Sequence, residues 1–149
     1  MHRSFAAAAL LLTTSDCAQL PQTNTVAIPL LRAGEARLWI YRSDGPYEPE
    51  ATPYIRLNGQ VVGTAWQSGA IYRDVAPGHY SITLDPSATD VNQFTDIDLT
   101  VGEQAYAKIL SLRCWQGGAF EPCLDAFYVR LMPPETALSE IAHNPFYGS

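Results

Sequence analysis

The residues in this sequence with the widest chemical range are its three cysteines, Cys17, Cys114 and Cys123. A cysteine thiolate accepts a lipid, forms a disulfide, holds a metal ion or acts as a nucleophile. Cys114 ends one strand-like run and Cys123 precedes another, and the loop between them contains Gly117-Gly118. A bridge here would join the two ends of a hairpin loop, and closing about ten residues stabilises a fold by roughly 2.5–3 kcal/mol. The sequence therefore predicts a disulfide between Cys114 and Cys123.

Other chemistry at this cysteine pair is less well supported. A zinc site needs two more soft or imidazole ligands, and the candidates His79 and His143 are far away in sequence. No His or Lys lies near either cysteine in the sequence to lower a thiol pKa for catalysis. We expect neither a metal ion nor another cofactor.

Catalysis by histidine also finds little support. Histidine is a common general base, but His79 follows Pro-Gly at the start of a predicted strand. Serines for a Ser–His–acid triad exist at Ser68, Ser81 and Ser111, yet none lies in a Gly-x-Ser-x-Gly turn. The sequence favours a structural, partly exposed histidine and a protein that is not an enzyme.

Four aromatic residues are the positive indication of a binding surface. Trp39 and Tyr41 share one face of a predicted strand, and Trp115 and Phe120 lie in the loop between the two cysteines. Exposed aromatic side chains favour recognition, because they offer a large contact area at low entropic cost. Two alternatives stay open for the strand pair: a second covered face of a sandwich strand, or burial beneath a C-terminal helix.

Composition narrows the class of partner. The chain carries 15 acidic and 9 basic residues, which give a net charge of −6. Lys108 is its one lysine. A nucleic-acid binder needs clustered cations to displace counterions from phosphate, and the sequence contains no such cluster. We therefore expect no nucleic-acid partner.

The first residues resemble an export signal. Residues 1–3 include one arginine, and residues 5–12 are apolar or alanine, a run too short to span a bilayer. Cys17 follows at the distance typical of bacterial lipoproteins, which are cut just before a lipid-bearing cysteine. The sequence thus predicts a lipoprotein signal peptide at residues 1–17, a flexible tether at 18–33, and a membrane anchor on Cys17.

The lipidation motif is atypical, so a second processing route stays open. Asp16 stands where Gly, Ala or Ser is usual, and Thr14 stands where Leu is usual. Cleavage without a lipid, after Ser15 or after Cys17, also fits the small residues present. Lipidation is favoured because it would leave no unpaired thiol in an oxidising compartment. With Ala18 rather than Asp next to the cysteine, the outer membrane is the favoured location.

The remaining chain reads as short strands. In residues 36–42, Ala36, Leu38 and Ile40 alternate with larger or polar residues, a period of two that indicates a strand. Asn58-Gly59 between two strand-like runs is typical of a type I′ hairpin turn. Further strands are predicted at residues 53–57, 60–65, 70–75, 79–84, 94–101, 104–113 and 125–132, and a short helix at 136–143.

Seven or eight short strands with tight turns and almost no helix predict an all-β, antiparallel β-sandwich over residues 34–149. The inner faces are expected to hold Ile97, Leu99 and Val101 from one strand. The last strand is expected to add Phe127, Val129 and Leu131, and the helix Leu138 and Ile141.

Three motifs together resemble a known family. They are an aliphatic–aromatic strand ending in Tyr41-Arg42, the hairpin Asn58-Gly59-Gln60-Val61-Val62-Gly63, and the turn Pro77-Gly78-His79-Tyr80. This pattern, over about residues 34–112, is similar to the bacterial family called domain of unknown function 2846, small exported proteins that are often lipoproteins. The resemblance implies a prealbumin-like or immunoglobulin-like sandwich in the cell envelope, and it implies no reaction.

The sequence as a whole predicts a non-enzymatic envelope lipoprotein that acts as a binding or scaffold module. Its partner would be an envelope protein or a glycan, and Trp39, Tyr41, Trp115 and Phe120 would contact it. A carbohydrate-binding module and a hydrolase of envelope polymers are the alternatives.

Overall fold

A computed structural model describes residues 19–45, 48–85, 93–112 and 125–149 of the chain. These residues form eight strands, one α-helix and one 3-10 turn. In chain order they are η1 (Thr23–Thr25), β1 (Ala36–Arg42), β2 (Tyr54–Leu57), β3 (Gln60–Thr64), β4 (Ala70–Val75), β5 (Gly78–Asp85), β6 (Phe94–Leu99), β7 (Gln104–Leu112), β8 (Ala126–Leu131) and α1 (Pro134–Ile141).

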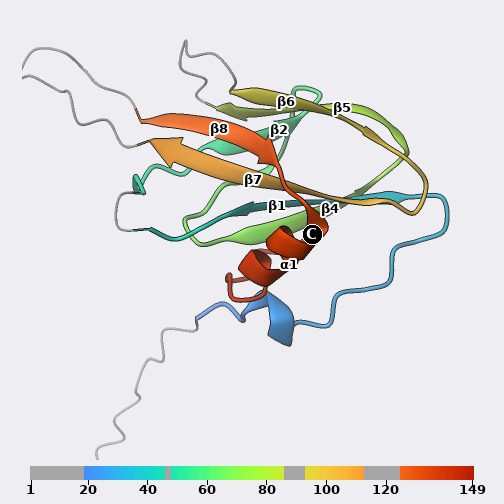
Figure 1. The fold of residues 1–149 in the computed structure, drawn as a ribbon, viewed down its shortest axis with the longest axis horizontal. Helices are drawn as coiled ribbons and strands as arrows, with labels where there is room; N and C mark the ends of the chain where they lie inside the picture. The colour runs from blue at the N-terminus through green and yellow to red at the C-terminus, as the bar shows by residue number, and fades with distance from the viewer. Residues whose placement is uncertain (1–18, 46–47, 86–92, 113–124) are drawn as a thin grey trace, which may run out of the picture.

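The strands form two four-stranded sheets that pack face to face (Figure 1). Sheet 1 has the order β4-β1-β7-β8 and sheet 2 has the order β3-β2-β5-β6. The all-β sandwich and the short C-terminal helix predicted from the sequence are confirmed. One strand pair among the described residues, β1 with β7, is parallel rather than antiparallel. A parallel pair forms without a crossover helix because the chain between β1 and β7 passes through sheet 2.

The main core lies between the sheets and follows the predicted alternation. Ala36, Leu38 and Ile40 of β1 are buried against Ile82 and Leu84 of β5. Ile97 and Leu99 of β6 and Phe127 and Val129 of β8 complete this core as predicted.

Two residues predicted for this core lie outside it. Val101 is exposed because β6 ends at Leu99 and the chain turns before reaching it. Leu131, at the end of β8, is also exposed.

The hairpin between β2 and β3 has the predicted turn. Asn58 and Gly59 have φ angles of 48° and 82°, the left-handed values that a type I′ turn requires at both central residues. Asn58 also donates to the carbonyl of His79 and accepts from the backbone N–H of Ser81, so the turn is tied to β5. The hairpin therefore holds β2 and β3 in a fixed register.

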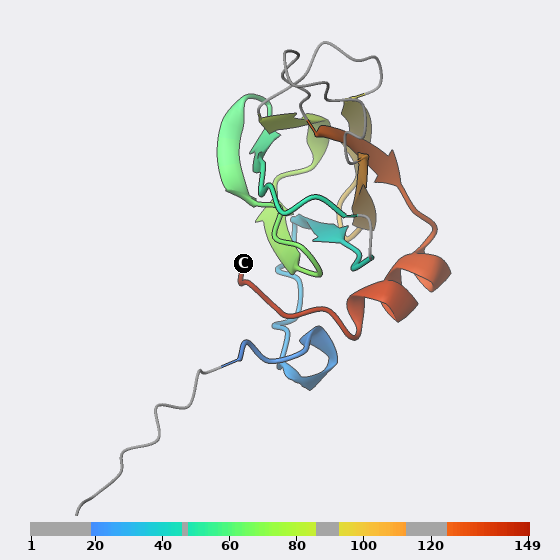
Figure 2. The same cartoon turned by 90° about the vertical axis from the view of Figure 1, so that its left-hand side faces the viewer.

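Helix α1 covers the outer face of sheet 1, as Figures 1 and 2 both show. It begins at Pro134, a residue suited to the first helical turn because its missing N–H would have no partner there. Ala137 and Ile141 face the sheet, whereas Leu138, predicted to pack, is exposed. The helix begins and ends two residues earlier than predicted, and the i, i+4 pair Ala137 and Ile141 forms its buried face.

A three-residue polar contact fastens α1 to sheet 1. Glu140 accepts hydrogen bonds from the Tyr41 hydroxyl at 2.6 Å and from Lys108 Nζ at 2.8 Å. Burial favours the neutral form of Glu140, but the bonds from Lys108 and Tyr41 together outweigh it and hold the Glu140 pKa below its ordinary value. Burial and the bond to Glu140 raise the pKa of Tyr41.

The segment predicted to be a flexible tether is attached to the domain over much of its length. Thr23 donates its backbone N–H and its hydroxyl to the carbonyl of Asn144, at 2.9 and 2.8 Å. Ile28 packs against the outer face of sheet 1, and the Pro29 carbonyl accepts a bond from Arg37. Residues 21–24 thus contact the end of the chain, and residues 28–29 contact sheet 1.

These contacts predict a pH-dependent attachment of α1. A carboxylate whose pKa is lowered by folding stabilises the fold above its unfolded pKa of about 4.3, and this contribution disappears as the pH falls through the folded value. We expect Glu140→Gln to lower the free energy of unfolding by about 1 kcal/mol at pH 7. At pH 3 the variant and the wild type should be nearly equal in stability.

Urea unfolding followed by tryptophan fluorescence measures both differences. Glu50→Gln, in an exposed loop, serves as the control and should leave stability unchanged at either pH. A Glu140→Gln deficit of the same size at pH 3 and pH 7 would contradict the proposed linkage.

Candidate functional site

The strand aromatics predicted to bind a partner are buried. Trp39 and Tyr41 are 6% and 1% exposed, in a second core with Tyr72 and Tyr106 on the outer face of sheet 1. Helix α1 and the terminal segments cover this face, and Trp39 lies 5.1 Å from the Tyr72 ring centroid. The assignment of Trp39 and Tyr41 to a partner-binding surface is therefore wrong; both residues pack the domain against its own helix.

Five further predicted residues lie outside the described part of the chain. They are the lipidation candidate Cys17, the disulfide candidates Cys114 and Cys123, and the loop aromatics Trp115 and Phe120. Their roles stay predictions from the sequence.

His79 lies on the outer face of sheet 2. Its Nδ1 is 2.8 Å from Asp98 Oδ1, on the neighbouring strand β6, and both side chains are mostly exposed. An exposed pair of this kind contributes little to stability and experiences nearly the dielectric of water. The place of His79 on an exposed strand face agrees with the partly exposed histidine expected from the sequence.

The outer face of sheet 2 is the open face of the sandwich. Sheet 2 lies on the opposite side of the molecule from α1 and the N-terminal segment (Figures 1 and 2). Tyr54, Val61 and Phe94 on this face are 55%, 50% and 58% exposed. Strand pairing places Arg56 between Val61 and Thr83, and Thr83 beside Phe94, so one row of side chains crosses all four strands. We call Tyr54, Arg56, Val61, Thr83 and Phe94 the open-face row.

Arg56 provides the charge in the middle of the open-face row. Its Nε and Nη2 donate to one oxygen of Asp85, at 3.0 and 2.7 Å, and its Nη1 donates to the Gly59 carbonyl at 2.8 Å. These bonds hold the guanidinium flat against the sheet, while about a third of the side chain stays exposed. Arg56 can therefore pair with an incoming acceptor without first losing much conformational freedom.

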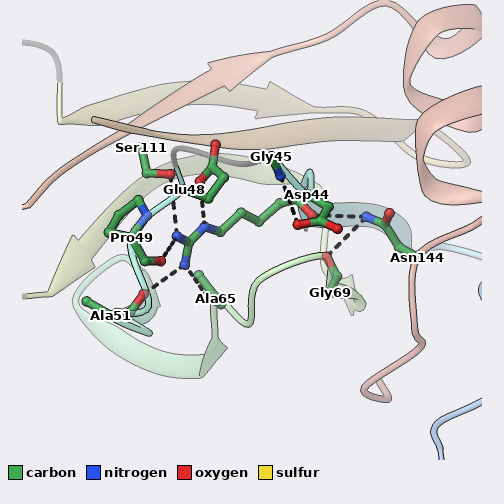
Figure 3. Close-up of polar contacts among 10 residues, drawn as sticks. Asp44, Gly45, Glu48, Pro49, Ala51, Ala65, Gly69, Ser111 and Asn144 are labelled. Carbon is green, nitrogen blue, oxygen red and sulfur yellow. Dashed lines mark hydrogen bonds and ion pairs between the residues drawn. The ribbon is translucent and has the colours of Figure 1, made fainter. Parts of the chain in front are cut away.

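A buried arginine organises the end of the sandwich from which β2 starts. Arg42 is fully buried at the end of β1. Its guanidinium donates to the carbonyls of Pro49 and Ala51 at 2.5 and 2.8 Å, and its Nε donates to Glu48 at 3.1 Å (Figure 3). Weaker contacts reach the Ala65 carbonyl and the Ser111 hydroxyl. The side chain thus holds the segment leading into β2, which carries Tyr54.

Asn144 connects this end of the sandwich to the chain after α1. Its side-chain amide donates to the Arg42 carbonyl at 3.1 Å and lies 3.5 Å from the Gly69 carbonyl (Figure 3). Because its own carbonyl binds Thr23, Asn144 links β1, the loop before β4 and the N-terminal segment.

Two kinds of site find no match in the described residues. No group of three or more His, Cys, Asp and Glu side chains is placed to hold a metal ion. Within the same ranges, no helix combines the length and apolar character needed to cross a bilayer.

The open-face row was missed by the sequence analysis, although a signal for it was present. Alternation in β2 puts Tyr54 and Arg56 opposite the buried Ile55 and Leu57. In β6 the same alternation puts Phe94 on the side of the outward-facing aspartates. Trp39 and Tyr41, two aromatic residues on one strand face, gave the stronger signal in the sequence.

Comparisons with known proteins add no assignment. No protein-family model matches the chain, and no curated protein matches it. The resemblance to domain of unknown function 2846 therefore stays a prediction that depends on its three motifs.

The contacts of Arg42 predict a large loss of stability when it is replaced. Arg42→Met would leave the Glu48 carboxylate and two buried carbonyls without their donor, a change that costs about 3–5 kcal/mol. Chemical unfolding in urea measures the loss. Arg56→Met is the matched control, because the ion pair it breaks is partly exposed and contributes less than about 1 kcal/mol. Equal, small losses for both variants would refute the organising role of Arg42.

Proposed function

We propose that this protein is a non-enzymatic binding module of the bacterial cell envelope, anchored through a lipid on Cys17, that binds a protein partner on the open-face row. The observation that carries the proposal is the contrast between the two outer faces. Sheet 1 is covered by α1 and the terminal segments, whereas sheet 2 exposes Tyr54, Val61 and Phe94.

The residue types of the open-face row support a protein partner. Tyr, Phe and Arg are enriched in protein interfaces, where rigid rings supply area and a guanidinium supplies directed hydrogen bonds. In this row Tyr54, Val61 and Phe94 surround a guanidinium already held by Asp85. Isolated exposed apolar side chains are ordinary, but three on one uncovered sheet face are consistent with a docking surface.

The export signal predicted at residues 1–17 supports the envelope location. A lipid on Cys17 would attach the chain two residues before Gln19, the first described residue. The hydrolase alternative has no observation in its favour among the described residues, because the most suitable base, His79, is paired with Asp98 on an exposed strand face.

Crosslinking in living cells tests the binding surface. A photo-crosslinking amino acid at Thr83, in the centre of the open-face row, should capture one defined partner. Phe94→Ala in the same chain should reduce the captured amount at least tenfold, the effect typical of an interface hot spot. The same amino acid at Leu30, which is highly exposed in the N-terminal segment, should not capture that partner. Equal capture from both positions would contradict the proposal.

A glycan partner is the second candidate. Tyr54 and Phe94 present aromatic side chains on either side of the Arg56–Asp85 pair, and sugars are bound by aromatic stacking together with charged hydrogen-bonding groups. Envelope glycans on an array should then bind the purified protein, and Tyr54→Ala should abolish the signal. An array profile that Tyr54→Ala leaves intact would exclude this face as a glycan site.

A further inference from the structure

A second exposed aromatic group lies beside the β3 edge of the sandwich, where the N-terminal segment meets the end of the chain. Trp66 and Tyr147 stack with ring centroids 5.4 Å apart and an interplanar angle of 10°. They are 43% and 38% exposed, and nearby Leu20 is 46% exposed. We call Leu20, Trp66 and Tyr147 the terminal patch.

The terminal patch borders a surface cleft of about 420 Å³. The cleft is lined by Gln19, Leu20, Gln22, His143, Pro145 and Tyr147. Among these described residues there is no Asp or Glu, although the chain carries a net charge of −6. The surface beside the start of the described chain is therefore uncharged or weakly basic while the whole chain is acidic.

The N-terminal segment is fixed to the domain immediately after Leu20. The Pro21 carbonyl accepts the N–H of Phe146 at 2.9 Å, and Thr23 bonds twice to the Asn144 carbonyl. Only residues 18–20 then separate Cys17 from the fixed point at Pro21. Four extended residues span at most about 14 Å, so an anchor on Cys17 would keep this end of the domain close to the bilayer.

We infer that the terminal patch lies in the headgroup region of a phospholipid bilayer and fixes the orientation of the domain on the membrane. This inference depends on the lipid anchor of the proposed function. The anchor supplies attachment, and the patch supplies orientation.

The chemistry of the terminal patch suits that location. Tyrosine and tryptophan concentrate at membrane–water interfaces, because each has an apolar ring and a polar group that stays hydrated. An acidic surface would be repelled by anionic lipids, and the lining of the cleft carries no carboxylate. Leu20 adds an aliphatic side chain one residue before the fixed point.

Such an orientation directs the open-face row away from the membrane. Sheet 2 lies on the side of the molecule opposite the N-terminal segment (Figure 1). With the terminal patch on the bilayer, Phe94 faces the aqueous side, because β6 is the edge of sheet 2 farthest from β3 and Trp66.

Quenching by brominated lipid tests the placement. The full chain, purified with its lipid, is reconstituted into phosphatidylethanolamine–phosphatidylglycerol vesicles containing phosphatidylcholine brominated on its acyl chains. Wild-type tryptophan emission should be quenched, and Trp66→Phe, which keeps an aromatic ring against Tyr147, should lose most of that quenching. Phe94→Trp, on β6 at the edge of sheet 2 farthest from β3, should add emission that the brominated lipid does not quench. Leu20→Asp, which adds a charge at an exposed position of the terminal patch, should be quenched at least twofold less than the wild type.

The outcomes separate the inference from the anchor. Intact mass showing no lipid on Cys17, with Cys17→Ser as the control, would overturn both the anchor and the inference. A lipidated chain whose quenching is the same in wild type, Trp66→Phe and Leu20→Asp would overturn the inference alone. Added quenching in Phe94→Trp would overturn the orientation as well.

Discussion

The burial of β1 on both of its faces is the constraint on which the rest of this structure depends. All seven residues of β1 are buried. Its aliphatic side chains fill the space between the sheets, and Trp39 and Tyr41 on the other side need a second cover. Helix α1 and the terminal segments supply that cover, so sheet 1 becomes the middle layer of three and sheet 2 keeps the open face.

Local sequence predicted the strands well because their signals are local. The Asn58-Gly59 turn and the strand predicted at residues 70–75 depend on neighbouring residues, and both agree with the structure. The sequence could not show that Trp39 is covered, because much of its cover comes from α1 and Phe146, more than ninety positions later. The parallel pairing of β1 with β7 is equally non-local. For the candidate site, alternation alone could have placed Phe94 outward, but only strand order brings it into one row with Arg56.

Polar side chains and the chain end restrict the free edges of the sandwich. Unpaired strand edges invite association with other chains, and natural sheets block them. The backbone of Ala70 in β4 bonds to Pro145 and Tyr147, so the end of the chain runs along that edge. Arg73 donates to the Val62 carbonyl of β3, and Thr95 donates to the Val129 carbonyl of β8 at 2.7 Å. These contacts leave fewer unpaired backbone groups along the two edges of the sandwich than bare strands would present.

The clasp between Thr23 and Asn144 has a consequence for how the chain matures. It joins residues 121 positions apart, and pairings this distant in sequence raise contact order and slow folding. Because the ribosome releases the N-terminal half first, β1 emerges before β7 and α1, the elements that pack against it, have been synthesised. We therefore expect the nascent polypeptide to complete its fold only when nearly its whole length is available.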